Sequence, residues 1–349
     1  MIFKIKNGKY DILGAGDRVM SNNNGILYIV QGFIAAGKST FSKKLKTDTN
    51  AIHINPDEWV SKLYKEDEYM NNWNECFDAT VNKLWIDTEK YLRDGKSVIF
   101  DMGFWKRKDR DYARNVANKC NAKCVHYYLF VPDEILKQRI ISTRPEKWAK
   151  IHIENFNKNK SMFEKPSSDE EIIKINNYKD IELLEILNKD LEYKAKMIGE
   201  ENINELYELC KSNDKYYSYL KEDLTMDGVK SILTDLPPNV TMDNKYVIGF
   251  YRENTLVAVL DLINDYPSNN TSFIGLFMLN KKYQGKGNGK QIIKKILNLY
   301  KSMDYESCHI GVIDSNIEAI RFWTKIGFNE NGTIYTHDKY NVIMMNFIL

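Results

Sequence analysis

The chain has 349 residues, of which 43% are hydrophobic and 12% aromatic, and its formal net charge at pH 7 is +2. This length and apolar content predict about two domains, each with its own core. The small net charge gives no polyelectrolyte signature of nucleic-acid binding, and no apolar run approaches the ~20 residues of a membrane span.

The cysteines and the first residues indicate a reducing compartment. The opening MIFKIKNGKYDIL lacks the apolar stretch and cleavage site of a secretory signal, so we expect a cytoplasmic location. The five cysteines are odd in number and scattered, which is typical of reduced thiols. Cys120 and Cys124 lack a second Cys or His pair at zinc spacing, which favours core packing over a metal clip.

A glycine-bounded loop follows the first apolar β-type run, Ile26 to Val30. Its pattern GxxxxGKS lets successive backbone N–H groups turn around phosphate oxygens at the start of a helix. The pattern predicts a site for ATP, and a chance glycine turn is the alternative. The expected phosphate-binding residues are Gly32, Ala35, Ala36, Gly37, Lys38, Ser39 and Thr40.

Two acidic residues follow predicted strands of the same sheet. Asp57 comes after Ala51 to Ile54, and Asp101 after Ser97 to Phe100. In an open parallel sheet both carboxylates face the crevice that holds the ligand. Asp57 is a candidate general base, although it could instead cap the helix that follows. Asp101 and Ser39 are the expected Mg²⁺ ligands.

The rest of the first half alternates helices and strands. A strand over Cys124 to Val131 leads into a helix with Arg139 and then to Arg144, and these arginines are candidates for neutralising charge on a phosphoryl group in transfer. A solvated basic helix is the alternative. The alternation predicts a doubly wound α/β fold. A helical core stripe is expected at Trp73, Phe77, Val81, Leu84, Trp85, Tyr91 and Leu92.

Residues 26 to about 175 resemble the P-loop kinase-like ATPases grouped with chloramphenicol phosphotransferase, gluconate kinase, zeta toxins and the 5′-kinase of polynucleotide kinase. The matching pieces are GFIAAGKST, INPDEW, VIFDMGFWKRKDRDYAR and YLFVPDEILKQRIISTR. The resemblance implies use of ATP and Mg²⁺, with Asp57 activating an acceptor hydroxyl. Related kinases often have Arg where this chain has Val60, which disfavours a phosphorylated or nucleic-acid acceptor.

The junction between the halves is charged and poor in aromatic residues. We expect one domain over 1–188 and another over 189–349. Ile181, Leu184 and Leu187 show partial helical spacing, so the linker is expected to be a helix.

The second half begins with a helix over Ile203 to Lys211 and continues with three strands, Tyr246 to Tyr251, Leu256 to Ile263 and Ser272 to Leu279. A second glycine loop then precedes an amphipathic helix, where backbone N–H groups can converge on a pyrophosphate. Alone, the loop fits equally well a second nucleotide turn or a flexible connection. Its residues are Gln284, Gly285, Lys286, Gly287, Asn288, Gly289 and Lys290.

Sequence motifs further along the chain make the resemblance of the second half specific. QGKGNG, Asn316, AIRFW and KIGF together resemble the GNAT acetyltransferase superfamily over residues 192–349. The resemblance implies an α+β mixed sheet and acetyl-CoA, with the glycine loop on its pyrophosphate. It also implies that backbone N–H groups near Met278 and Leu279 bind the thioester carbonyl and that Asn316 contacts the pantetheine arm.

The sequence identifies the general acid and the general base of acetyl transfer less clearly than the coenzyme site. Family members often use a tyrosine as general acid where this chain has Trp323, and indole cannot supply the proton. Tyr283, Tyr300 or water would have to substitute. Asp261 on the neighbouring strand is the best candidate base, and a strand-end carboxylate bonded to backbone N–H groups is the alternative.

The sequence therefore predicts a bifunctional enzyme that phosphorylates a hydroxyl and acetylates an amine of small molecules, including metabolites or antibiotics. One rival is a regulatory protein that senses nucleotide or acyl-CoA without turnover. The other is a polynucleotide end kinase with an acetyltransferase-like module. Neither the acceptors nor the oligomeric state follow from the sequence.

Overall fold

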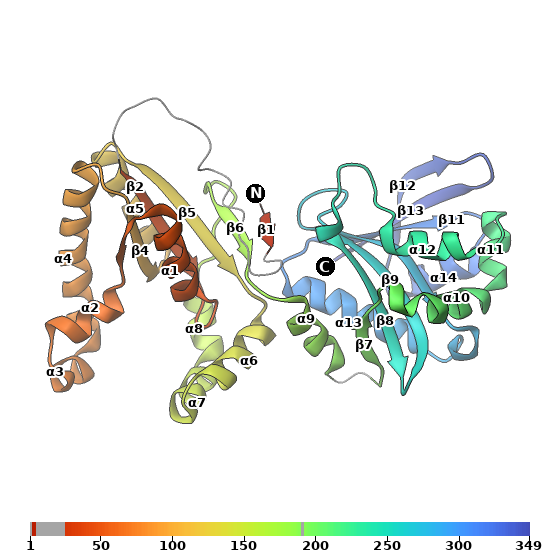
Figure 1. The fold of residues 1–349 in the computed structure, drawn as a ribbon, viewed down its shortest axis with the longest axis horizontal. Helices are drawn as coiled ribbons and strands as arrows, with labels where there is room; N and C mark the ends of the chain where they lie inside the picture. Colours follow the sequence, from red (N-terminus) through yellow and green to blue (C-terminus); the bar gives the residue numbers. More distant parts are fainter. Residues whose placement is uncertain (1, 5–24, 190–191) are drawn as a thin grey trace. The chain divides into compact units, whose positions relative to one another are not determined.

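The protein folds into two compact units, Met1–Lys179 and Asp180–Leu349 (Figure 1). The computed structural model describes residues 2–4, 25–189 and 192–349. The division precedes the boundary expected near residue 188, because helix α9 (Asp180–Asn188) packs on β7 (Lys194–Met197) and α13 (Asn288–Ser302) of the second unit. The junction is helical, as its apolar spacing predicted.

The first unit is built on a parallel sheet. Its strands are β1 Ile2–Lys4, β2 Ile26–Gly32, β3 Ile52–Ile54, β4 Val98–Gly103, β5 Lys123–Phe130 and β6 Ile173–Asn176. They lie in the order β1-β6-β5-β2-β4-β3 with all neighbours parallel. This order confirms the doubly wound fold and sets β2, which leads into the phosphate loop, between β4 and β5.

Helices of the first unit are α1 Lys38–Thr49, α2 Pro56–Leu63, α3 Glu66–Asn71, α4 Trp73–Arg93, α5 Arg107–Lys119, α6 Asp133–Thr143, α7 Glu146–Glu154 and α8 Phe156–Met162. Trp85 of α4 stacks on Phe100 of β4 with ring centroids 4.0 Å apart, inside a core that also contains Leu84. The expected core stripe is wrong at its first turn, since Trp73 is 42% exposed. At this turn Trp73 contacts Tyr69 of α3, with ring centroids 6.0 Å apart.

The second unit is built on a mixed sheet. Besides β7, its strands are β8 Lys245–Arg252, β9 Thr255–Asn264, β10 Thr271–Leu279, β11 Ser307–Ile313, β12 Asn329–Thr336 and β13 Asn341–Ile348. They lie in the order β12-β13-β11-β10-β9-β8-β7, and among these described strands only the β10 and β11 pair is parallel. The predicted α+β mixed sheet is confirmed.

Strands β10 and β11 separate partway along their length. Their parallel pairing covers Thr271–Ile274 against Ser307–Ile310, whereas β10 continues to Leu279 beside β9. A bulge at Gly275 marks the separation. Beyond it, the edge of β10 that faces β11 is left without strand partners in the described sheet, which makes backbone groups available to a ligand.

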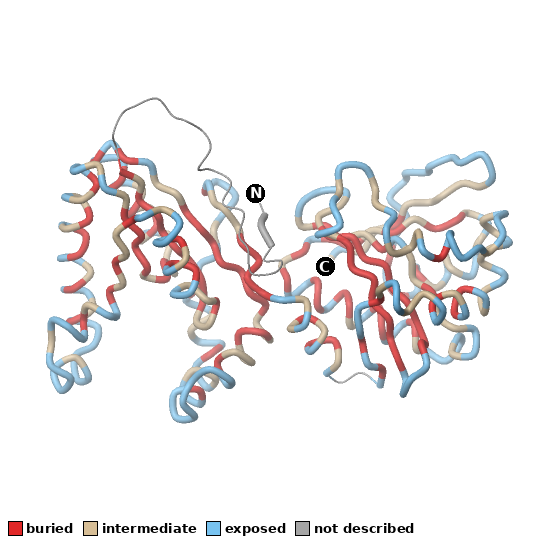
Figure 2. The backbone as a smooth tube through the Cα atoms, viewed as in Figure 1, coloured by how far each residue is buried: buried red, intermediate tan, exposed pale blue. Residues whose placement is uncertain are grey.

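The other helices of the second unit are α10 Ile203–Lys211, α11 Asp214–Leu220, α12 Met226–Thr234 and α14 Ile317–Ile326, with 3₁₀ turns at Glu200–Asn202, Met242–Asn244 and Lys281–Tyr283. Figure 2 shows buried strands at the centre of each unit and exposed outer faces of the helices. Among the described residues, no helix combines the length and apolar character needed to cross a membrane.

Candidate functional sites in the two units

The loop between β2 and α1 forms a cradle for phosphate groups. Ala35 and Gly37 have left-handed backbone angles, with φ of 64° and 86°. Helix α1 begins at Lys38 with no side-chain cap and no acidic residue in its first turn. Its first N–H groups and the positive end of its dipole are therefore directed at the loop, and this cradle fits the phosphates of ATP.

Lys38 lies among the other residues predicted for phosphoryl transfer. Its Nζ donates to the Phe33 carbonyl at 3.0 Å. Burial lowers the pKa of Lys38, the negative charges of Asp101 and Asp57 raise it, and Arg144 adds a smaller lowering effect. These interactions place both carboxylates and Arg144 around Lys38, as the sequence predicted for one crevice.

Asp57 does not cap its helix. Asn55 is the N-cap of α2, and its Oδ1 accepts a hydrogen bond from Glu58 N at 3.2 Å. The pKa of Asp57 is raised chiefly by the protein atoms around its carboxyl group; Lys38 opposes this rise, and Asp101 adds to it. A carboxyl group with a raised pKa beside Lys38 suits a general base.

Asp101 is a buried carboxylate with a histidine partner. It is 4% exposed, and its Oδ2 lies 3.3 Å from Nε2 of His53 on the neighbouring strand β3. Within the described residues no group of three or more His, Cys, Asp or Glu forms a metal site. A Mg²⁺ ion at Ser39 and Asp101 would therefore take most of its ligands from phosphates and water, which is its usual preference. His53 was not among the residues predicted for the site, because it alternates with apolar residues in β3.

The two arginines predicted to neutralise phosphoryl charge lie in different surroundings. Arg139 Nη2 donates to the Asn177 carbonyl at 2.8 Å and Nη1 to the Ala35 carbonyl at 3.4 Å, so this side chain ties the phosphate loop to the end of β6. Asn177 Nδ2 in turn donates to the Ala36 carbonyl at 2.6 Å. Arg144 is exposed and acts on the charge of Lys38. Arg144 is therefore the arginine better placed to meet a phosphoryl group.

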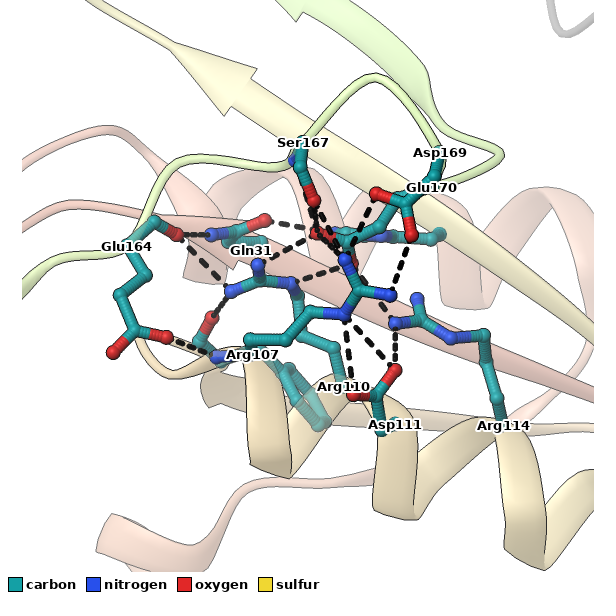
Figure 3. Close-up of polar contacts among 11 residues, drawn as sticks. Gln31, Arg107, Arg110, Asp111, Arg114, Glu164, Ser167, Asp169 and Glu170 are labelled. Atoms are coloured by element: carbon teal, nitrogen blue, oxygen red, sulfur yellow. Dashed lines mark hydrogen bonds and ion pairs between the residues drawn. The ribbon is translucent and has the colours of Figure 1, made fainter.

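A buried ion-pair network fastens the segment 164–170 to helix α5 (Figure 3). Arg110, 1% exposed, donates to both oxygens of Glu170 at 2.8 Å and to the Glu164 carbonyl at 3.0 Å. Arg114 also contacts Glu170, and Arg107 binds Asp169. Arg110 and Glu170 are 60 positions apart in the chain, so no local sequence pattern indicates their pairing.

The second glycine loop leads directly into α13. Gly285 and Gly287 have φ of 72° and 85°, and a Cβ built on either would meet no protein atom within 4 Å. Helix α13 has no side-chain cap and no acidic residue in its first turn. This open, positively polarised loop fits the pyrophosphate of acetyl-CoA. Gly289 differs, since its Cβ would lie 3.3 Å from Phe277 and Phe322, so this glycine permits close packing.

Side chains of the second glycine loop form hydrogen bonds that fix the shape of the loop. Gln284 Nε2 donates to the Leu279 carbonyl and to Asn213 Oδ1, each at 2.8 Å. Asn288 Nδ2 donates to the Tyr283 carbonyl at 2.7 Å. The loop shape is thus set before a ligand arrives, and backbone N–H groups are left to bind the anion.

The residues predicted for the thioester and pantetheine lie beyond the point where β10 leaves β11. Met278 and Leu279 belong to the part of β10 that pairs only with β9 in the described sheet. Asn316 caps α14, its Oδ1 accepting from Ala319 N at 3.1 Å. Its Nδ2 has no hydrogen-bond partner within the described ranges, so a donor remains for a pantetheine carbonyl.

A cavity of about 580 Å³ in the second unit, here called the acidic cavity, lies between α11, α12 and strands β9 and β10. It reaches Gly275 and Leu276, where β10 and β11 separate. No Lys or Arg is among the described residues that line it. Its acidic lining residues are Glu222, Asp223, Asp235 and Asp261, and its aromatic ones are Tyr216, Tyr217, Tyr266 and Phe273.

Asp261 is paired with a buried lysine. Lys245 Nζ donates to its two oxygens at 2.8 and 2.9 Å and to the Asp235 carbonyl at 2.9 Å. Burial raises the pKa of Asp261, Lys245 opposes the rise, and Asp235 adds to it. The alternative of backbone N–H partners is wrong for this carboxylate, which is bound by the ammonium of Lys245. The sequence signal was a lysine opening an otherwise apolar strand.

Burial limits which of the named residues can act as the general acid. Trp323 is 4% exposed and packs against Phe277, Phe322 and Phe328, so it belongs to the core. Tyr300 is also 4% exposed, and its hydroxyl donates to an Asn264 oxygen at 2.5 Å beneath helix α9, which leaves it unsuited to protonate a thiolate. Of the two tyrosines named from the sequence, Tyr283 beside the glycine loop remains.

Fold and sites together define a P-loop nucleotide-binding unit followed by an acyl-CoA-binding unit. Residues 27–166 match the family model described as "AAA domain", and residues 195–328 match the model "Acetyltransferase (GNAT) family". The chain is therefore a fusion of a kinase-like P-loop domain with a GNAT-family domain, as the resemblance predicted.

The curated relatives match the second unit. A probable spermine N(1)-acetyltransferase of Bacillus subtilis subsp. natto (strain BEST195) is 32% identical over 96 residues, covering 25% of this chain and 61% of the relative. The spermine/spermidine N(1)-acetyltransferase of Bacillus subtilis (strain 168) is 31% identical with the same coverage, so the chain spans less than two thirds of either relative. A solved acetyltransferase from Thermus thermophilus is 15% identical at a TM-score of 0.38, covering 46% of this chain and 98% of its own.

Proposed function

We propose that the second unit transfers an acetyl group from acetyl-CoA to a primary amine of a small molecule that carries further positive charge. The observation behind this proposal is the acidic cavity, which reaches the point where β10 leaves β11 and is lined by four carboxylates and, among the described residues, by no lysine or arginine. Two of these carboxylates are paired with lysines outside the lining, Asp261 with Lys245 and Glu222 with Lys339, so Asp223 and Asp235 keep the cavity negative. The names of the two Bacillus relatives, which mention spermine and spermidine, support the same substrate class.

Different residues of this unit carry out the separate parts of acetyl transfer. An amine arrives as an ammonium and must lose a proton before it attacks, which is the role proposed for Asp261. Glu222, Asp223 and Asp235 hold the remaining charge of the substrate. Backbone N–H groups at the open edge of β10 stabilise negative charge on the thioester oxygen.

The test compares spermine and spermidine with propylamine at constant ionic strength, measuring release of the coenzyme A thiol. We expect kcat/KM to rise with the number of charges on the amine, and Glu222→Gln to reduce that preference. Glu318→Gln, which changes an exposed carboxylate outside the cavity, should leave it unchanged. Equal rates for mono- and polyamines would exclude a polycationic acceptor.

The coenzyme site has a test of its own. Gly287→Glu places volume and negative charge where the loop is open, so acetyl-CoA affinity should fall while ATP affinity stays the same. Gly332→Glu is a matched control, because Gly332 has nearly the same φ, 84°, and equally free space in the β12 to β13 region. Equal loss in both variants would indicate backbone strain alone.

For the first unit we propose phosphorylation of a small-molecule hydroxyl with ATP and Mg²⁺. Bound MgATP supplies the phosphoryl group. Lys38 and the loop N–H groups position it, Ser39 and Asp101 hold the metal, and Asp57 removes the proton of the acceptor hydroxyl. The support is the convergence of Asp57, Asp101 and Arg144 on Lys38. A compound with hydroxyls and amines would let both units serve one substrate.

Calorimetry with MgATP tests the nucleotide site. Lys38→Ala should abolish MgATP binding and leave acetyl-CoA binding intact, whereas Lys43→Ala, an exposed change on the same helix, should leave both intact. ATP and acetyl-CoA binding without transfer to any hydroxyl or amine would favour a sensor. Salt-sensitive oligonucleotide binding would favour an end kinase. A cytoplasmic location remains part of the proposal.

A further inference from the structure

Trp105 lies beside the centre of the phosphate site. Strand β4 ends at Gly103 and the chain turns sharply there, with φ of 86° at Gly103 and 48° at the buried Phe104. A Cβ built on Gly103 would lie 3.3 Å from Trp105 Nε1 and 3.6 Å from Lys38 Cε. Indole Nε1 and Lys38 Cε both lie close to Gly103 and are therefore within about 7 Å of each other. Asp101 lies two residues before the end of β4.

The indole is held in this position from several sides. Its ring stacks on Phe33 of the phosphate loop, with centroids 5.2 Å apart and planes 18° apart. Phe163 approaches it edge-on at 6.1 Å. The Trp105 carbonyl accepts from Glu164 N at 2.8 Å, in the segment fastened by Arg110. Because Phe33 belongs to the loop, the indole and the phosphate cradle form one packed assembly.

The N–H of this indole has no partner among the described residues, although the ring is only partly exposed. This nitrogen is not among the enclosed polar atoms of the described residues that lack a partner, so it remains accessible to a ligand. Indole nitrogen only donates, so the missing partner is an acceptor atom. Phosphoryl oxygens are the acceptors that the neighbouring loop and Lys38 are built to receive.

We infer that Trp105 donates its indole N–H to an oxygen of the phosphoryl group in transfer. This inference rests on the proposed phosphotransferase function of the first unit. The bond adds a fixed neutral donor to Lys38 and Arg144 at the place where charge develops, which is the kind of interaction that stabilises a transition state. Trp105 is then a catalytic residue in addition to a packing residue.

The test uses Trp105→Phe, which keeps an aromatic ring against Phe33 and removes the donor together with part of the ring; loss of packing alone should weaken MgADP and the analogue equally. Affinities are measured for MgADP alone and for MgADP with aluminium fluoride, an analogue of the transferring phosphoryl group. We expect the analogue to bind about 10-fold or more weakly and MgADP to change by less than about 2-fold, since one charge-assisted hydrogen bond is lost. Trp73→Phe, at the exposed start of α4, should change neither.

Tryptophan fluorescence gives an independent readout. In the wild type, binding of MgADP with aluminium fluoride should change the emission of Trp105, and this change should vanish in Trp105→Phe and persist in Trp73→Phe. Equal weakening of MgADP and its aluminium fluoride complex, or no weakening of either, would overturn the inference. A raised KM for the acceptor with unchanged analogue binding would also overturn it, because the N–H would then contact the acceptor. If Lys38→Ala still binds MgATP, the proposed nucleotide site itself is wrong.

Discussion

Lys245 Nζ binds both carboxylate oxygens of Asp261, at 2.8 and 2.9 Å, in the wall of the acidic cavity. Burial and the neighbouring Asp235 raise the pKa of Asp261, and Lys245 counteracts them. The lysine therefore favours the ionised carboxylate that a general base requires. Its own side chain is 1% exposed, so it cannot be replaced by solvent.

Lys245→Met should raise the pKa of Asp261 further. A base works only when deprotonated, so the acid limb of the pH profile of acetyl transfer should move to higher pH, with activity lost first at low pH. Breaking a buried pair should also cost about 3–5 kcal/mol in the free energy of unfolding. Lys230→Met, which alters an exposed pair on α12, should leave the profile in place. Equal loss of activity at every pH would show a structural role only.

Asp57→Asn should reduce phosphoryl transfer roughly 100-fold while MgATP affinity is retained, the scale of a lost general base. In the wild type the raised pKa of Asp57 means that activity falls, as pH decreases, earlier than for an ordinary aspartate. Glu58→Gln changes the adjacent carboxylate and should keep turnover near wild type. Because Asn55 is the helix cap, stability should barely change; a clear loss of stability at normal turnover would assign Asp57 to structure.

The parts of this protein that could be predicted from sequence are those set by local pattern. The two glycine loops follow from glycines that permit left-handed angles, Gly37 in the first unit and Gly287 in the second, and from the strand-to-helix context around them. The doubly wound fold, the mixed sheet and the helical junction also follow from periodicity and family resemblance.

What escaped prediction depends on contacts between distant residues. Arg110 and Glu170 are 60 positions apart, and Lys245 and Asp261 are brought together by the pairing of β8 with β9. No periodic pattern records such pairs. The stacking of Trp105 on Phe33 is another such contact, because nothing in the local sequence distinguishes Trp105 from the other aromatic residues.

The Arg110 and Glu170 pair offers a test of the network in Figure 3. Either Arg110→Met or Glu170→Gln should destabilise the first unit by up to about 3–5 kcal/mol, because each removes one partner of a buried ion pair. Arg114 still contacts Glu170 in the first variant, so we expect that variant to lose less than the second. The double variant should lose less than the sum of the single changes. Denaturant unfolding measures all three, and the exposed pair of Lys150 and Glu154 serves as the control, with an effect of at most about 1 kcal/mol. Strict additivity would contradict coupling between the two side chains.

His126 should make the stability of the first unit depend on pH. It is 3% exposed, bonded through Nε2 to Gln31, and burial lowers its pKa from 6.5 to about 3. As the pH falls below 6.5, this histidine takes up a proton in the unfolded chain but stays neutral in the folded protein. The free energy of unfolding therefore decreases between pH 6.5 and 3, by at most about 1.4 kcal/mol per pH unit.

Calorimetry between pH 7 and 5 should show this loss in the transition that MgATP shifts upward. His126→Asn, whose amide can still donate to Gln31, should flatten the profile, and His337→Asn, an exposed change in the second unit, should not. A wild-type slope that persists in His126→Asn would assign the pH dependence to other groups.

The position of helix α9 decides where the chain can be cut. Leu183 and Leu187 are buried and line an apolar contact with Ile296 and Leu299 of α13, so α9 contributes to the core of the second unit. A fragment over 180–349 should therefore fold and bind acetyl-CoA. A fragment over 189–349 exposes that surface and should lose several kcal/mol, at about 1.5–3 kcal/mol for each buried leucine.

Thermal unfolding and acetyl-CoA titration of the two fragments measure the difference, and a fragment over 1–179 should bind MgATP alone. Replacing Ile181, which is 57% exposed on the same helix, with Ala in the 180–349 fragment is the control and should change little. Because α13 begins at the glycine loop, loss of α9 removes packing from the helix that presents this loop, so acetyl-CoA affinity should fall together with stability. If the two fragments are equally stable and bind acetyl-CoA equally well, the domain boundary lies near residue 188 and α9 is a linker.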